Sequence, residues 1–154
     1  MTTQAMQRTD TTIRPAAPSD LDAIERLLTQ SSLPLEGVRE SLAHFVVAEA
    51  GNELVGVAGL EICCDNALLR SVAVAPEWRS HGLGRALVTR IVSDAEARGL
   101  RALYLLTMTA EHYFPRFGFE VVERGAVPPA IAETLEFRSA CPASAVAMAR
   151  PVTA

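Results

Sequence analysis

The apolar residues in the first half of the chain form short runs that are separated by turn residues. Runs of this length and composition predict β-strands rather than helices. The expected strands cover residues 11–16, 45–50, 54–63 and 68–74. Turn residues at Gly51-Asn52 and Asp65-Asn66 join the last three strands, which should therefore form an antiparallel meander.

Helical spacing appears between the first two of these strands. The capping residue Ser19 precedes an apolar stripe with a period close to that of an α-helix. The stripe consists of Leu21, Ile24, Leu27 and Leu28. A second, short helix is expected after Pro34, running through Val38 to Leu42.

The second half of the chain alternates helical and strand patterns. A long amphipathic helix is predicted to begin near Leu83 and to end at Gly99. The elements expected after it are a strand at 103–108, a short helix at 110–117, a strand at 119–123, a helix at 127–137 and a strand at 143–150. Strands followed by alternating helices and strands predict an α/β (α+β) fold, in which helices cover a mixed sheet.

Composition excludes several classes of function for such a fold. The 154 residues are 49% hydrophobic and 21% charged, with a net charge of -4, as in a single globular domain. Residues 1–10 are polar and are interpreted as a flexible tail ahead of a domain at 11–154. The sequence shows no basic stripe for nucleic acid, no membrane-length apolar stretch and no secretory h-region, so a cytoplasmic location is expected. Its three cysteines lack metal-ligand spacing, and no metal site is expected.

The candidate chemistry lies where the fourth strand passes into the long helix. This strand stops at Pro76, and the loop Arg79-Ser80-His81-Gly82-Leu83-Gly84 leads into the helix. Such a loop presents several backbone N–H groups at a helix N-terminus, where the helix dipole favours an anion. Gly82 and Gly84 let the backbone approach a bulky anion, and Arg79 adds a fixed positive charge. The loop has neither the Gly-Lys-Ser/Thr ending of a P-loop nor the spacing of a dinucleotide-binding fingerprint.

The order V-x-P, R-x-x-G-x-G and amphipathic helix resembles the acetyl-CoA-binding signature of the GNAT N-acetyltransferase superfamily. The resemblance extends over most of the chain and implies a mostly antiparallel central sheet of about seven strands, with helices on both faces. It implies that backbone groups around Val72 and Val74 orient the acetyl carbonyl and stabilise its oxyanion. With Thr107, these are the expected catalytic positions. The expected contacts of acetyl-CoA are Val72, Ala73, Val74, Arg79, Ser80, His81, Gly82, Leu83, Gly84, Arg85 and Phe114.

A second family motif, N-x-x-A-x-x-x-Y, is matched in spacing but not in chemistry. Thr107, Ala110 and Phe114 take the three positions, and Gly118-Phe119 follows as in many relatives. A phenyl ring cannot protonate the departing thiolate. Tyr113 is the alternative donor, although one helical step turns it about 100° away from Phe114.

The strand before the loop lacks the glutamate that serves many relatives as general base. Leu68 stands at that place. Strand alternation would put Leu68, Arg70, Val72 and Val74 on one face, so that Arg70 is presented to the substrate near the acetyl group. Glu61 on the preceding strand is either a group that holds a water as base or part of a solvated face.

Two narrower resemblances concern the acceptor. Residues 69–74 are similar to the same strand in short amino-acid N-acetyltransferases of the N-acetylglutamate synthase type. Residues 67–71 together with 137–148 resemble the arsenic-resistance N-acetyltransferases. This resemblance implies a glutamate-like acceptor, such as arsinothricin or phosphinothricin, whose anionic ends suit guanidinium groups. The candidate acceptor-binding residues are Arg70, Arg116, Arg138, Tyr113 and His44.

Simpler interpretations stand beside some of these assignments. Arg116 is equally well placed as a solvent-facing residue, and His44 as a partly buried surface residue. The expected partner is a small amino-acid-like molecule, and assembly into a homodimer is an open alternative. The alternative functions are acetylation of another amine, a protein N-terminus or a lysine, and non-catalytic sensing of acetyl-CoA.

Overall fold

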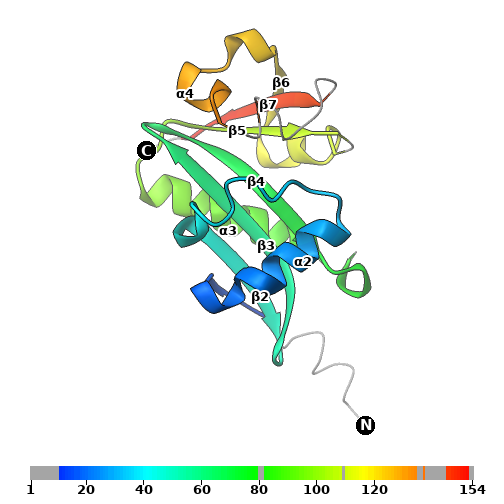
Figure 1. Cartoon of the computed structure of the whole chain (residues 1–154). Helices are drawn as coiled ribbons and strands as arrows, with labels where there is room; N and C mark the ends of the chain where they lie inside the picture. Colours follow the sequence, from blue (N-terminus) through cyan, green and yellow to red (C-terminus); the bar gives the residue numbers. More distant parts are fainter. Residues whose placement is uncertain (1–10, 80–81, 109, 135–136, 138–144, 153–154) are drawn as a thin grey trace.

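A computed structural model describes residues 11–79, 82–108, 110–134, 137 and 145–152 of the chain. In this part, seven strands form one sheet in the order β1-β2-β3-β4-β5-β7-β6 (Figure 1). The strands are β1 (Thr11–Pro15), β2 (Phe45–Ala50), β3 (Glu53–Cys63), β4 (Asn66–Val74), β5 (Ala102–Thr107), β6 (Glu120–Val122) and β7 (Val146–Pro151). Strands β4 and β5 pair in parallel, and the other neighbouring strands pair antiparallel. The mixed, mostly antiparallel sheet expected from the sequence is confirmed.

Two helices of the described part cover opposite faces of the sheet (Figure 1). The helix α3 (Leu83–Ala97) packs on one face, where Leu87, Val88 and Ile91 are fully buried. The helix α2 (Leu21–Gln30) packs on the other face through Ile24, Leu27 and Leu28, three residues of the predicted stripe. A short helix, α4 (Pro129–Ala132), covers the far end of the sheet in a smaller cluster with Leu68. None of the helices in the described part is long and apolar enough to cross a membrane.

Three of the expected helices differ from the structure. Residues 36–41 form turns followed by a 3₁₀ turn at Leu42–His44, because Gly37 has a φ of +83° that ends helical geometry. The segment expected at 110–117 is helical over Phe114–Phe117 alone, as a 3₁₀ turn that contains Pro115. In the segment 127–137, α4 ends at Ala132, where the Thr134 hydroxyl donates to the Ile131 carbonyl at 2.8 Å. Short apolar runs next to Pro or Gly therefore carry too little periodicity to predict a regular helix.

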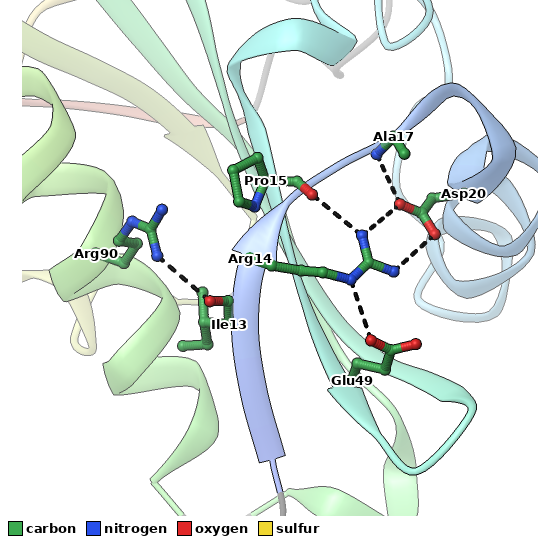
Figure 2. Close-up of polar contacts among 7 residues, drawn as sticks. All are labelled: Ile13, Arg14, Pro15, Ala17, Asp20, Glu49 and Arg90. Carbon is green, nitrogen blue, oxygen red and sulfur yellow. Dashed lines mark hydrogen bonds and ion pairs between the residues drawn. The ribbon is translucent and has the colours of Figure 1, made fainter.

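A polar cluster around Arg14 ties the first strand to its neighbours (Figure 2). The Arg14 guanidinium donates to both carboxylate oxygens of Asp20, at 2.8 and 3.1 Å, and to Glu49 Oε1 at 3.1 Å. Asp20 also accepts the backbone N–H of Ala17 at 2.7 Å. The cluster thus joins β1, the start of α2 and β2 through one fork-shaped side chain.

Candidate active site

The sheet opens between its two parallel strands. The register of β4 with β5 runs from Asn66↔Ala102 to Leu68↔Tyr104, and beyond this point the two strands separate. A cleft of about 500 Å³ occupies the opening and is lined by residues 69–74 of β4 and by residues 105–108 from β5 and its end. The edge of β4 that would bond to β5 therefore faces the cleft, and its backbone groups are available to a ligand.

A β-bulge in β4 shapes this opening. Arg70 pairs with Gly59 and Ala73 with Val57, so that one additional residue is accommodated on β4, and Ser71 has a φ of +62°. The bulge breaks strand alternation. The expectation that Leu68, Arg70, Val72 and Val74 share one face is therefore wrong: Val72 and Val74 pack on the α3 side with Leu69, whereas Arg70 contacts Glu61 on the opposite side, where Leu68 lies.

The N-terminus of α3 lies next to Tyr113, a residue of the cleft lining. Gly82 is its N-cap with a φ of +82°, and a Cβ built there would meet nothing within 4 Å. The Arg79 Nε donates to the carbonyl of Val74 at 3.0 Å, which fixes the arginine at the end of β4 and in the wall of the cleft. Leu83 is buried in the core and can offer a ligand its backbone alone, whereas Arg85 is exposed. Ser80 and His81 lie outside the described residues.

Three residues of the second family motif line the cleft beside this helix end. Thr107 Oγ1 accepts the backbone N–H of Ala110 at 2.9 Å and so begins the turn after β5. Phe114 is 8% exposed and packs edge-on against Phe119. Tyr113 stacks edge-on against Phe114, and its hydroxyl oxygen lies 3.3 Å from the position that a Cβ on Gly84 would take. Its phenol therefore reaches the first turn of α3.

The predicted acceptor residues divide into two groups. Arg70 and Tyr113 both line the cleft. Arg116 lies 4.6 Å over the Tyr113 ring and lines a separate cavity with Arg150. His44 lines another cavity, beside Arg90 and Arg98, where burial and then the charge of Arg98 lower its pKa. Arg138 lies outside the described residues. The structure thus brings two of the five candidates to the cleft and places two elsewhere.

The wall opposite α3 was not predicted from the sequence. It consists of Ser31, Ser32, Leu33 and Pro34, which follow α2 and line the cleft; we call them the acceptor wall. Ser32 holds a φ of +58°, unusual for a residue other than glycine, and marks the sharp exit from the helix. Pro34 and Gly37 signal an irregular segment in the sequence, but nothing local indicates that it reaches Arg70 of β4, 36 residues later.

A sheet that splays between two parallel strands, with a glycine-capped helix N-terminus at the opening, defines a site for an extended ligand that carries an anionic group. Residues 41–121 match the model of the acetyltransferase (GNAT) domain, and the chain belongs to this family.

Comparison with individual proteins narrows the relationship. The chain is 32% identical over 135 residues to the amino-acid acetyltransferase of Pseudomonas fluorescens, a match that covers 82% of this chain and 31% of that protein. Among solved structures, N-acetylglutamate synthase from Neisseria gonorrhoeae complexed with coenzyme A and N-acetyl-glutamate superposes with a TM-score of 0.80 at 21% identity, over 94% of this chain and 35% of the other. Rv2747 from Mycobacterium tuberculosis, in complex with CoA and NLQ, gives 0.78 at 26% identity, over 92% and 99% of the two chains. The chain thus spans about a third of the length of the first two proteins.

Proposed function

We propose that the chain transfers an acetyl group from acetyl-CoA to the α-amine of a small, glutamate-like acid. The observation that carries this proposal is that one cleft is lined by the acceptor wall and also by Arg79, just before α3, and by Tyr113, whose hydroxyl reaches the first turn of that helix. A cofactor held at Gly82 and Arg79 would extend its acyl group along the open edge of β4. An acceptor resting on the acceptor wall would then meet this group beside the bulge.

The cofactor end of the cleft fits the pyrophosphate of acetyl-CoA. The space beside Gly82 is open, the positive end of a 15-residue helix faces it, and Arg79 stands near it. When bound there, the cofactor would supply an activated thioester. The residues of β4 from Leu69 to Val74 would hold its acyl end through backbone hydrogen bonds, as an added strand would be held.

Among the described residues, few side chains at the reacting end can transfer a proton. Leu68 is fully buried and Phe114 has no acidic group, so neither replaces the glutamate or the tyrosine of many relatives. The amine nitrogen attacks the carbonyl carbon, the carbon–sulfur bond breaks, and the proton released by nitrogen leaves through water. Backbone N–H groups of β4 around Val72 and Val74 steady the negative charge that develops on the carbonyl oxygen. Most of the rate then comes from holding the two reactants together.

The acceptor is proposed to be an α-amino acid with a second anionic end, such as arsinothricin or phosphinothricin. The relatives support an amino-acid acceptor: one is an amino-acid acetyltransferase, and one structure holds N-acetyl-glutamate. The detoxification of an arsenic or phosphorus mimic of glutamate rests on the sequence resemblance alone. Direct contact between Arg70 and an acceptor anion is the prediction made from the sequence, and the ion pair of Arg70 with Glu61 offers positioning as the alternative.

Thioester turnover with a panel of acceptors tests this function. We expect release of free CoA with glutamate, phosphinothricin or arsinothricin to exceed that with simple amines and with peptides bearing a free N-terminus or lysine. Preference for a peptide or a simple amine would replace the proposal with acetylation of a protein N-terminus, a lysine or another amine. Binding of acetyl-CoA without turnover of any acceptor would favour a non-catalytic sensor of acetyl-CoA.

A further inference from the structure

We propose that the Glu61–Arg70 ion pair is a positioning device that sets the acceptor end of the cleft, and that it acts through the acceptor wall rather than by contact with the acceptor. The inference rests on the proposed function, because it concerns where the acceptor of that reaction lies.

One guanidinium joins three parts of the structure that are distant in the sequence. Arg70 Nη1 donates to Glu61 Oε1 on β3 at 3.0 Å, and the Arg70 side chain has no exposed surface. Its Nε donates to the hydroxyl of Ser71 at 3.1 Å, at the bulge that opens β4. Its Nη2 donates to the carbonyl of Pro34, in the acceptor wall, at 3.4 Å. Arg70 therefore links the bulge on one side of the opening to the acceptor wall on the other.

Gly37 provides a second point at which this loop rests on the ion pair. A Cβ built on Gly37 would lie 2.7 Å from Arg70 Nη1 and 3.4 Å from Glu61 Oε1, the first distance being too short for real atoms. The backbone after the acceptor wall therefore packs directly on the ion pair, and a residue with a side chain would have to displace it. The loop is held from Pro34 to Gly37 by one rigid, planar group.

The role of Glu61 follows from the burial of its partner. Removing one partner of a buried, hydrogen-bonded charge is unfavourable, so loss of the Glu61 carboxylate would weaken the hold on Nη1 and make the Arg70 guanidinium move or draw in water. Either change would release the Pro34 carbonyl and shift the acceptor wall. Glu61 itself is absent from the lining of the cleft, so its effect on an acceptor must pass through Arg70. At the cofactor end, the Arg79 Nε donates instead to the carbonyl of Val74, at the far end of β4 from Glu61's partner Leu68.

Steady-state kinetics of Glu61→Gln and Gly37→Ala test the inference. We expect the KM for the acceptor to rise by about tenfold or more in both variants, since a displacement of about 1 Å in a binding site can reduce rates up to a hundredfold. The KM for acetyl-CoA should change less than about twofold, within ordinary independence of distant sites. In an Arg70→Ala background, Glu61→Gln should add nothing further. Gly51→Ala is the matched control, because Gly51 also has a positive φ, +61°, but its Cβ would meet nothing within 4 Å.

Two acceptors that each lack one carboxylate separate positioning from direct contact. Positioning predicts the same fold-change in KM for glutamate, glutamine and isoglutamine in Glu61→Gln and in Arg70→Ala. If Arg70 binds an acceptor carboxylate, the analogue that lacks this carboxylate will be insensitive to Arg70→Ala, and the inference fails. It also fails if folded Glu61→Gln and Gly37→Ala keep the wild-type KM.

Hydrogen–deuterium exchange gives a readout that does not depend on turnover. Peptides covering residues 31–41 should exchange faster in Glu61→Gln and Gly37→Ala than in the wild type and in Gly51→Ala, whereas peptides from α3 should not. Unchanged exchange at 31–41 would overturn the positioning role whatever the activity. Suppose that the wild type acetylates neither glutamate nor phosphinothricin nor arsinothricin, while exchange at 31–41 is faster in the variants. This result would defeat the proposed function and leave the role of the ion pair in place.

Discussion

The glycine that caps α3 offers a sharp test of the cofactor site, because the same chain contains a matched control. Gly82 begins the helix with a φ of +82°, and Gly99 follows its end with a φ of +72°. A Cβ at either position would meet nothing within 4 Å. Substitution by alanine therefore adds no clash in either case, and the two variants share one source of instability, the left-handed backbone.

The magnitudes follow from this geometry. Left-handed backbone at a residue other than glycine costs roughly 1–2 kcal/mol. For a domain of this size we expect Gly82→Ala and Gly99→Ala to lower the Tm by about 2–8 °C each, at about 2–4 °C per kcal/mol. Acetyl-CoA at about 100 times its Kd stabilises the folded state by about 2.7 kcal/mol, which corresponds to a rise of about 5–10 °C in wild type.

Thermal-shift titration with acetyl-CoA separates the two variants. In Gly99→Ala the ligand-induced rise should be intact, because that end of the helix is distant from the cleft. In Gly82→Ala the new methyl group would occupy the space proposed for the pyrophosphate, and the rise should be largely lost at the same concentration. If Gly82→Ala keeps the full rise, or if Gly99→Ala loses it, the cofactor does not bind where the structure suggests.

Four further outcomes follow from the site and its surroundings. Phe114→Leu should lower the free energy of unfolding by about 1–2 kcal/mol through lost packing and should leave the shape of the pH–rate profile unchanged. Tyr113→Phe should raise the KM for acetyl-CoA, since its hydroxyl reaches the first turn of α3; loss of the basic limb of the profile would instead identify Tyr113 as the general acid. The pKa of Asp20 is lowered from its ordinary value of 3.8, chiefly by its hydrogen bonds from Arg14. This pair therefore stabilises the fold fully above pH 3.8, and the stabilisation is lost as the pH falls through the lowered pKa. Urea titrations should show Asp20→Asn to be less stable than wild type at pH 7 and equally stable in acid. Burial raises the pKa of the Cys63 thiol to about 11, so mass spectrometry should find Cys63 resistant to iodoacetamide at pH 8 and increasingly modified above pH 10.

The sequence predicted those parts of the fold whose signal is local and repeated. The meander β2–β4 and the helix α3 were predicted well, because alternating or helical periodicity extends over six residues or more and glycines mark the ends. The helix expected after Pro34, through Val38 to Leu42, was wrong, because its few apolar residues also satisfy a set of turns around Gly37. Its position is set by contacts with Arg70, which a local pattern does not contain.

The candidate site also has one part that local sequence indicates and one part that it does not. The loop at Gly82 is local, since a strand, a stop and a capped helix follow one another, and the family model confirms the family that it indicated. The proposed acceptor end is assembled from the segment after α2, from β3 and from β4. The bulge at Ser71 reversed the assignment of faces, because one inserted residue moves every later side chain to the other side of the sheet. No feature of the strand 68–74 by itself indicates where that residue falls.

Loss of the usual acid and base does not by itself make this domain a sensor. General acid and base catalysis contribute about 10²–10⁴-fold, or about 3–5 kcal/mol of the barrier. Holding two reactants in line contributes more, about 7–11 kcal/mol in well-oriented systems. The features that would supply this larger contribution are present: the open edge of β4, the capped end of α3 and an acceptor wall that the buried Arg70 guanidinium contacts. A pure sensor has no need of a second wall beyond the acyl group, nor of a buried guanidinium that holds it. The fold thus orders residues at the proposed acceptor end, and this favours an enzyme whose rate depends on how accurately the amine is placed.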